Sequence, residues 1–372
     1  MEPNIDTHIK ELVHLIHTKY AAPAASVKPA KSMNLAVTIQ YLTLDVVSEL
    51  SLGKPFGDLK ADEDVNDYLK ASAEGLRIGN VSWALGTMWL RDIPIIGPAI
   101  SPSEKDASGF GRMMAETRKI IDERRAKPTD EKSDILASFI RNGVSGDDLF
   151  HEVFEQILAG ADTTAGAIRA TLLFLMSNPR AYRKLQAEID EAVQEGVAPA
   201  APGIISDAEA RRLPYLTAVV REGMRIHPPA VNLFSRIAPP EGDAVTVEGE
   251  EYFIPGGTMI GYSAWSMHKN NKAVYGNDAE AFRPERWILS EDDPDEKERL
   301  ARMIKVNDLV FGYGRWVCLG KVVALIEVHK ALFELLRHFD FAITNPVKPW
   351  ETYNSLGLWE INNMPVNVTE RS

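Results

Sequence analysis

The chain has a single cysteine, Cys318, among its 372 residues. One cysteine cannot form an internal disulfide, so packing alone must hold the fold, and a reducing compartment is the expected environment of the thiol. Hydrophobic residues make up 45% of the sequence and charged residues 25%, which is typical of a globular protein with a sizeable core. The length suits one large domain or two smaller ones.

Charge argues against one class of partner, and hydropathy argues against a membrane-spanning helix. The formal net charge of -12 argues against a nucleic-acid surface, because binding phosphates requires clustered Lys and Arg. The polar N-terminus is unlike a signal peptide, and no run of eighteen apolar residues predicts a membrane-spanning helix. An apolar, Trp-rich segment at residues 83–100 is interpreted as an ordinary core segment, with contact to a membrane or partner as the alternative.

Apolar residues recur at three- and four-residue spacing over much of the chain, which predicts amphipathic helices. Proline disfavours helical geometry in the residue before it, so His227-Pro228-Pro229 ends the last helix of the series. Short β-rich segments separated by Gly and Pro follow. The predicted helices cover residues 5–20, 34–51, 63–77, 104–126, 133–141, 147–176, 180–195 and 214–227, and the predicted strands cover 231–238, 244–247, 252–254 and 258–262. The fold class is therefore mainly α with a small β region, and an acidic run at 291–298 is interpreted as a solvated surface insertion.

A glycine-bearing loop at residues 311–321 contains Cys318 and runs into an apolar helical segment that begins at Val322. Free backbone N–H groups and the positive dipole end at a helix N-terminus favour a thiolate over a thiol. Gly314 and Gly320 would let the backbone approach a flat cofactor closely. The loop thus favours Cys318 as a soft ligand.

Three other interpretations of Cys318 were weighed. A lone cysteine is usually a small buried core residue. A nucleophilic cysteine of the tyrosine phosphatase type needs an Arg six residues later, where this chain has Ala324. A dinucleotide-binding loop needs a third glycine after Gly312 and Gly314, and a βαβ context that is missing here.

The middle of the longest predicted helix carries Ala159-Gly160-Ala161-Asp162-Thr163-Thr164, in which Gly160 and the two threonines are poor helix formers. A threonine hydroxyl that bonds back to a carbonyl would bend the helix and leave a groove, into which an adjacent acid could pass protons. Alternatively a helix begins here, with Asp162 or Thr163 as its N-cap. These six residues alone leave both interpretations open.

Together with these features, the cysteine loop resembles the haem-binding loop of cytochromes P450, whose usual pattern is Phe-x-x-Gly-x-Arg-x-Cys-x-Gly. Phe311, Gly314, Cys318 and Gly320 match that pattern, whereas Trp316 occupies the usual Arg or His position and Arg315 stands one position earlier. The resemblance implies that Cys318 is the axial thiolate ligand of a haem b iron. It also makes Arg315 a candidate to replace the usual ligand of a haem propionate.

The same resemblance implies roles for six further residues. Asp162 and Thr163 match the acid–alcohol pair that supplies protons for the cleavage of dioxygen. Arg236 matches a second propionate ligand, with a solvent-facing strand residue as the alternative. Glu222, Arg225 and Arg286 match a buried charge network behind the haem loop, although taken alone Glu222 and Arg225 are merely three residues apart on a helix.

The resemblance extends over nearly the whole chain and implies one domain, residues 1–372, that is similar to the filamentous-fungal branch including pisatin demethylases. The first sheet, the first helices and the Trp-x-x-x-Arg haem clamp of that family are not found in the sequence. The chain is therefore interpreted as N-terminally truncated, with a cytochrome P450 fold that lacks these parts.

The implied function is a haem-thiolate monooxygenase that inserts one atom of dioxygen into a hydrophobic small molecule of secondary or xenobiotic metabolism. Electrons would come from NADPH–cytochrome P450 reductase, and the protein would be a monomer. Two alternatives stay open, a non-catalytic remnant of such an enzyme and a helical interaction module. Full-length members of the branch are anchored in the endoplasmic reticulum membrane; for this chain, with no predicted anchor, a cytoplasmic location is the alternative.

Overall fold

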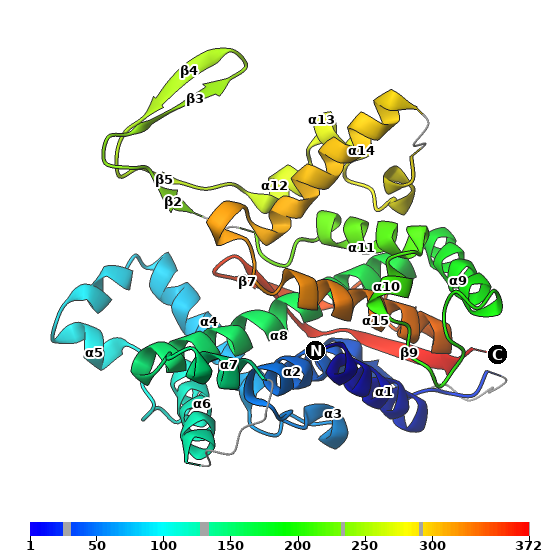
Figure 1. The fold of residues 1–372 in the computed structure, drawn as a ribbon, viewed down its shortest axis with the longest axis horizontal. Coiled ribbons are helices and arrows are strands. Elements are labelled where there is room, and N and C mark those ends of the chain that lie inside the picture. The colour runs from blue at the N-terminus through cyan, green and yellow to red at the C-terminus, as the bar shows by residue number, and fades with distance from the viewer. Residues whose placement is uncertain (25–30, 127–133, 232–234, 290–292, 372) are drawn as a thin grey trace.

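A helix of 31 residues, α8 (Gly146–Met176), runs through the middle of the computed structural model (Figure 1). Helix α2 (Leu35–Leu52) packs along it. A Cβ atom added at Gly160 would lie 2.8 Å from Val47 Cγ2, so the absence of a side chain at this position permits the close approach of the two helices. The glycine that seemed to weaken the helix thus serves its packing.

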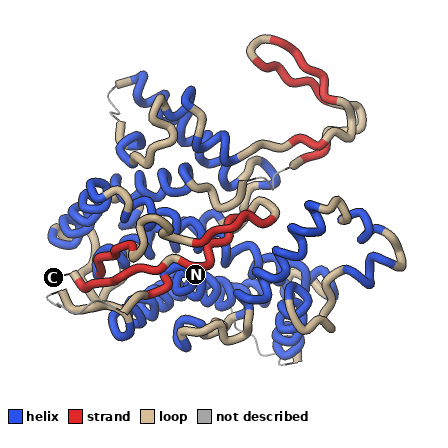
Figure 2. The backbone as a smooth tube through the Cα atoms, turned by 180° about the vertical axis from the view of Figure 1, so that it is seen from behind, coloured by secondary structure: helices blue, strands red, loops and turns tan. Residues whose placement is uncertain are grey.

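The structure describes residues 1–372 except 25–30, 127–133, 232–234, 290–292 and 372. Most of the described residues are helical (Figure 2). The remaining α-helices are α1 (Glu2–Lys19), α3 (Asp58–Ala61), α4 (Tyr68–Ala84), α5 (Ile96–Ile100), α6 (Gly109–Arg125), α7 (Ile135–Arg141), α9 (Pro179–Gln194), α10 (Asp207–Ala210), α11 (Pro214–Ile226), α12 (Ala264–Lys269), α13 (Lys272–Tyr275), α14 (Pro294–Asn307) and α15 (Lys321–His338). Short 3-10 helices are η1 (Met88–Asp92), η2 (Pro284–Trp287), η3 (Asp308–Phe311) and η4 (Gly314–Trp316).

The strands form small antiparallel sheets. The order β1 (Met33–Asn34), β9 (Pro365–Glu370), β6 (Phe339–Ile343) makes a three-stranded sheet. Two-stranded sheets pair β2 (Arg236–Ile237) with β5 (Met259–Ile260), β3 (Asp243–Val247) with β4 (Glu250–Ile254), and β7 (Glu351–Ser355) with β8 (Leu358–Asn363). The β3–β4 hairpin projects from the helical body, and nearly all its residues are exposed (Figure 1).

Two large apolar clusters fill the interior, and α8 belongs to both. Its first half contributes Phe150, Val153 and Ile157 to a cluster with residues of α4, α6 and α7. Its second half contributes Ile168 and Leu172 to a larger cluster with residues of α1, α2, α9, α11, α15 and the three-stranded sheet. The helix periodicity in the sequence corresponds to these buried faces.

The mainly helical class with a small β region is confirmed. The eight predicted helices all exist, with boundaries that shift by up to seven residues at one end. Of the predicted strand at 231–238, only Arg236–Ile237 is a strand, and residues 232–234 lie outside the described part. The acidic run at 291–298 leads into α14, which was not predicted. Residues 291 and 292 of this run also lie outside the described part. The strands β6 to β9 were missed as well.

The interpretation of residues 83–100 as a core segment is wrong. Trp83 is 63% exposed, Trp89 61% and Ile95 87%. The end of α4, η1 and α5 form an excursion at the edge of the molecule (Figure 1), so these side chains have little protein to pack against.

By length and composition, α2 could cross a membrane, the one such helix among the described residues. However, 83% of its apolar window is buried inside the protein, and core helices commonly pass the same test.

Candidate functional site

The loop around Cys318 places the thiol on an exposed surface. The loop leaves η3, passes through η4 and enters α15 with Gly320 as the N-cap residue. The backbone N–H of Cys318 donates to the carbonyl of Phe311 at 2.7 Å, which closes the loop on itself. The interpretation of Cys318 as a buried core residue is therefore wrong.

Apolar side chains surround the thiol and face solvent. Trp316 is 58% exposed, Val317 41%, Leu319 97% and Val322 60%. Gly314 has a φ of +63°, and a Cβ atom there would meet no atom within 4 Å. An exposed apolar surface of this kind suits a ligand that covers it, and the open backbone at Gly314 suits a flat one.

Two cations lie beside the same loop. The guanidinium of Arg236 lies over the Trp316 ring, 4.9 Å from its centroid, and that of Arg315 lies 5.6 Å from it. The hydroxyl of Tyr262 donates to the carbonyl of Leu309 at 2.5 Å, which ties the end of the β2–β5 sheet to the loop. Arg236 Nη1 donates to the carbonyl of its neighbour Ser235 at 2.8 Å. Within the described residues neither arginine forms an ion pair with a carboxylate, so both remain available to an acidic ligand group.

Helix α8 passes through residues 159–164 without a break. The interpretation of Asp162 or Thr163 as an N-cap is therefore wrong. The Thr163 hydroxyl donates to the carbonyl of Ala159 at 2.9 Å, and Thr43 of α2 donates to the carbonyl of Ala161 at 2.9 Å. Both hydroxyls add a bond to a helix carbonyl, which is the local perturbation that threonines were expected to cause.

Asp162 has partners different from those of Thr163. Its Oδ1 accepts from Gln40 Nε2 at 2.7 Å and its Oδ2 accepts from Ser72 Oγ at 3.2 Å. Burial raises the pKa of Asp162, while the Arg169 guanidinium and the two hydrogen bonds act against that rise. No hydrogen bond joins Asp162 to Thr163 in the described structure, so they are neighbours in sequence with separate contacts.

The structure brings Glu222, Arg225 and Arg286 together in a fully buried cluster. Arg225 forms a bidentate pair with Glu222, 2.8 Å at each contact, and Arg286 Nε donates to Glu222 Oε1 at 3.0 Å. Trp287 Nε1 donates to Glu222 Oε2 at 2.9 Å. The two guanidinium groups also donate to backbone carbonyls between residues 268 and 281, so the cluster holds the irregular segment before η2 against α11.

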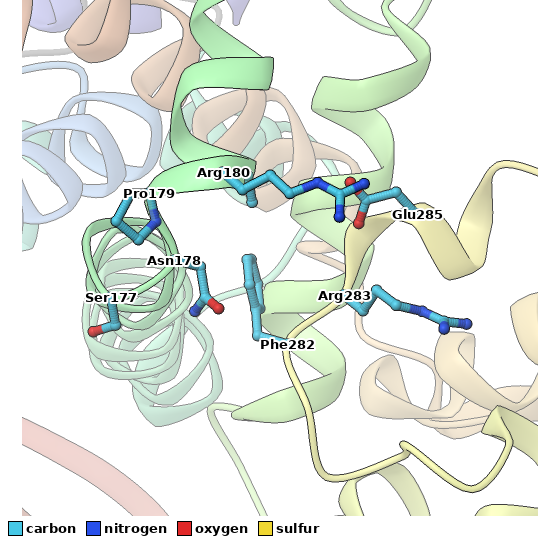
Figure 3. A pocket seen from close by; sticks show the side chains of 8 residues that line it. Ser177, Asn178, Pro179, Arg180, Phe282, Arg283 and Glu285 are labelled. Carbon is cyan, nitrogen blue, oxygen red and sulfur yellow. The ribbon is translucent and has the colours of Figure 1, made fainter.

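A pocket of about 560 Å³ opens between the end of α8 and the loop before η2 (Figure 3). Ser177, which lines this pocket, is far from Thr163 along the helix. The fourteen residues from Thr163 to Ser177 along α8 span roughly 21 Å at 1.5 Å each. Two of the charged groups that line the pocket already have partners: Arg283 contacts Asp278 at 2.8 Å, and Glu285 accepts from the Tyr215 hydroxyl at 3.0 Å. We do not assign the reaction to this pocket.

Sequence reasoning missed the partners of Asp162. Gln40 is 122 residues away in the chain and lies in a helix that is otherwise strongly apolar. A glutamine on such a helix signals a buried polar contact, but the pattern gives no indication of its partner. Arg169 carries the same signal, because it is a charged residue in the apolar second half of α8, whereas Ser72 carries none.

The whole chain is similar to known proteins. A family model described as Cytochrome P450 matches residues 1–366. A cytochrome P450 monooxygenase ABA1 of Pyricularia oryzae is 39% identical over 373 residues, which cover all of this chain and 70% of that protein. A cytochrome P450 monooxygenase aba1 of Botryotinia fuckeliana is 36% identical over 374 residues, with the same coverage.

Two solved structures have a similar fold. The crystal structure of a cytochrome P450 (CYP102L1) matches with a TM-score of 0.73 and 22% identity, over 99% of this chain and 74% of the other. The cytochrome P450DA heme domain matches with a TM-score of 0.73 and 18% identity, over 100% of this chain and 75% of the other. At these identities the structural likeness concerns the fold alone.

Proposed function

The chain belongs to the cytochrome P450 family, and on this premise we propose that it is a haem-thiolate monooxygenase in which Cys318 ligates the iron of haem b. The observation that carries the proposal is the exposed thiol at the N-terminus of α15, surrounded by exposed apolar side chains. A sulfur in this position is soft and accessible, and the helix dipole favours its anionic form. When bound, the haem would supply the oxidation chemistry of dioxygen and substrate.

The residues around Cys318 would bind and orient that group. Trp316 and Leu319 would cover its apolar surface and keep water from the thiolate. Arg236 and Arg315 would pair with its two carboxylates, which would otherwise lie uncompensated against apolar surface. Trp316 occupies the position of the usual basic residue and contacts both guanidinium groups, which supports a propionate-binding role for these two arginines in place of that residue.

Asp162 and Thr163 would move protons. The Thr163 hydroxyl donates to the Ala159 carbonyl, so the lone pairs of its oxygen are free to accept a hydrogen bond from a proton donor. Asp162 is the preceding residue in the chain. A raised pKa brings a carboxyl closer to neutral pH, where it can both give and take a proton. Glu222, Arg225 and Arg286 would have a structural role behind the haem loop.

A hydrophobic small molecule of fungal secondary metabolism is the proposed substrate, since the similar proteins are fungal monooxygenases. The redox partner would be NADPH–cytochrome P450 reductase, with dioxygen as co-substrate. We propose that the protein acts as a monomer at the endoplasmic reticulum membrane.

The test replaces the sulfur. Purified chain is loaded with haem, reduced and exposed to carbon monoxide, and its Soret band is recorded. The wild-type chain should give a thiolate-type band, and Cys318→Ser should lose that band because an alcohol oxygen is a poor ligand for this iron. Val347→Ser, at another exposed apolar position in the loop between β6 and β7, is the control and should keep it. If Cys318→Ser gives the same Soret band as the wild type, the proposal is wrong, and failure of the wild type to bind haem would favour a non-catalytic remnant.

A further inference from the structure

A buried polar chain connects α8, α2 and β8 beside Asp162. Arg169 Nη1 donates to the carbonyl of Ile361 at 3.1 Å, and Arg169 Nη2 donates to Gln40 Oε1. Gln40 Nε2 in turn donates to Asp162 Oδ1 at 2.7 Å. Gln40 is 5% exposed and Arg169 3% exposed, so water competes little for these bonds.

The chemistry of the two end groups determines which way the Gln40 amide faces. A guanidinium only donates, so it requires the carbonyl oxygen of the amide. A carboxylate only accepts, so it requires the amide nitrogen. Reversal of the amide would place like groups together at both ends, which makes the observed orientation the single one that satisfies both neighbours.

We propose that Gln40 and Arg169 are positioning residues for Asp162, which fix its carboxylate and keep it ionisable for the proton transfer assigned to it above. The inference rests on the proposed function, because proton transfer by Asp162 is part of that function. Neither residue is expected to touch substrate or haem. Arg169 acts through Gln40, and Gln40 acts through one hydrogen bond to Asp162.

The charges around Asp162 support this arrangement. Arg169 is on the same helix, two turns further on, and its charge lowers the pKa of Asp162. Burial lowers the pKa of Arg169 to about 10, which leaves it cationic at neutral pH. Glu360 of β8 is close enough to interact electrostatically with Asp162. Burial and the charge of Asp162 raise the pKa of Glu360, and the charge of Arg77 on α4 acts against that rise. From α4, Ser72 completes the contacts of the carboxylate.

The pocket beside Asp162 shows how few other groups could replace Gln40. Its lining is otherwise largely apolar, with Leu44, Met113, Ile157 and Leu158 among the contacts. If the amide were lost, Asp162 would keep only the longer bond from Ser72 and the charge of Arg169.

The first experiment measures the protonation of Asp162 itself. The carboxyl stretch of this residue is isolated as the infrared difference between each protein and its Asp162→Asn counterpart, and is followed through a pH titration. Gln40→Leu should raise the pKa of Asp162 by about one to two units, the size expected for loss of one hydrogen bond to a charged group. Gln40→Glu keeps the shape and the contact with Arg169 but presents an anion to Asp162, so the rise should be larger.

The matched control is Gln186→Leu. Gln186 is also a buried glutamine whose Nε2 donates to an aspartate, Asp340, at 2.7 Å, but it lies on α9 against β6. Its loss should leave the titration of Asp162 unchanged. Equal titration of Asp162 in wild type, Gln40→Leu and Gln40→Glu would overturn the proposal. Since this experiment does not need haem, its outcome is independent of the proposed function.

The second experiment asks whether positioning affects proton delivery. Haem-loaded protein is supplied with NADPH, reductase and dioxygen, and the fraction of NADPH electrons recovered as hydrogen peroxide is measured. Cleavage of the O–O bond requires both protons on the same oxygen atom, so that water leaves. When proton delivery is misplaced and each oxygen receives one proton, the dioxygen, having accepted two electrons and two protons, leaves as hydrogen peroxide. Gln40→Glu and Asp162→Asn should both raise the peroxide fraction several-fold, and Gln186→Leu should not. A shifted titration with an unchanged peroxide fraction would overturn the positioning role, whereas no NADPH consumption by the wild type would count against the proposed function alone.

Discussion

Trp316 departs from the usual pattern of the haem-binding loop, because an indole stands where a basic side chain is usual. Two guanidinium groups lie against this ring, Arg236 from a strand and Arg315 from the loop itself. Arginine stacks well on aromatic faces while its N–H groups remain free at the edge. The indole can therefore hold both cations in place for a ligand that carries two carboxylates.

Removal of either arginine should weaken haem binding. We expect Arg315→Ala and Arg236→Ala each to lower haem affinity about fivefold, or about 1 kcal/mol, since both groups are partly solvated and screened. Haem titration followed at the Soret band measures this affinity. Arg183→Ala, at an exposed position on α9, is the control. Unchanged haem affinity in Arg315→Ala would contradict a role for Arg315 in binding haem.

At the residue scale, the sequence was informative where chemistry follows a local pattern. The loop and helix around Cys318 predicted a soft ligand, and its role as the haem ligand stays a proposal. The spacing of Glu222 and Arg225, together with the resemblance, predicted a contact that the structure contains. Gln40 and Arg169 could not be predicted in this way. Their contacts join segments more than a hundred residues apart, and no spacing rule specifies which buried amide meets which carboxylate.

At the scale of elements, the contact between α2 and α8 depends on the small residue at position 160. We expect Gly160→Ala to destabilise the protein by about 1–3 kcal/mol, because the new methyl group would overlap Val47. The free energy of unfolding from denaturant titration measures the change.

Gly166→Ala is the matched control on the same helix. A Cβ atom there would lie 3.9 Å from the nearest atom, an ordinary contact. The substitution should be neutral or stabilising by up to about 1 kcal/mol, because alanine favours a helix over glycine. Val47→Ala should restore part of the stability lost in Gly160→Ala. Equal effects of the two glycine substitutions would contradict this account.

Helices were easier to predict than strands for a physical reason. The long amphipathic helices bury one face, and that face leaves a repeating pattern in the sequence. The strands β6 to β9 are only five or six residues long, so the alternation of buried and exposed residues that β6 and β9 do show covers too few residues to be recognised in the sequence. Helix α14 begins in an acidic run that resembled a solvated loop, and the exposed excursion at residues 83–100 has the composition of a core segment.

At the scale of the whole molecule, burial of histidines makes stability depend on pH. Burial lowers the pKa of His268 to about 4, from an ordinary value of 6.5. The unfolded chain therefore binds a proton between these values that the folded chain does not, and the contribution of His268 to stability falls as pH falls from about 6.5 to about 4. His227, whose pKa burial also lowers to about 4, acts in the same direction.

We expect this effect in the difference between two proteins. The stability of wild type relative to His268→Gln should fall by about 3 kcal/mol between pH 6.5 and 4, at about 1.4 kcal/mol per pKa unit. Buried acids such as Asp58, with a pKa raised to about 7, oppose the trend in both proteins and so cancel. Denaturant titrations across this range measure the difference, and His14→Gln on α1 controls for the replacement itself. A difference that is constant with pH would contradict the assignment.

Helix α8 has a consequence for how the molecule unfolds. Because α8 runs without a break from one apolar cluster into the other, one cluster can open alone only if this helix breaks between Ala161 and Ala165. Amides along its roughly 46 Å should therefore exchange with deuterium in one concerted event, at a rate set by global unfolding. The turns that carry the acid and the hydroxyl would share that protection, so the geometry needed for proton transfer persists as long as the protein stays folded.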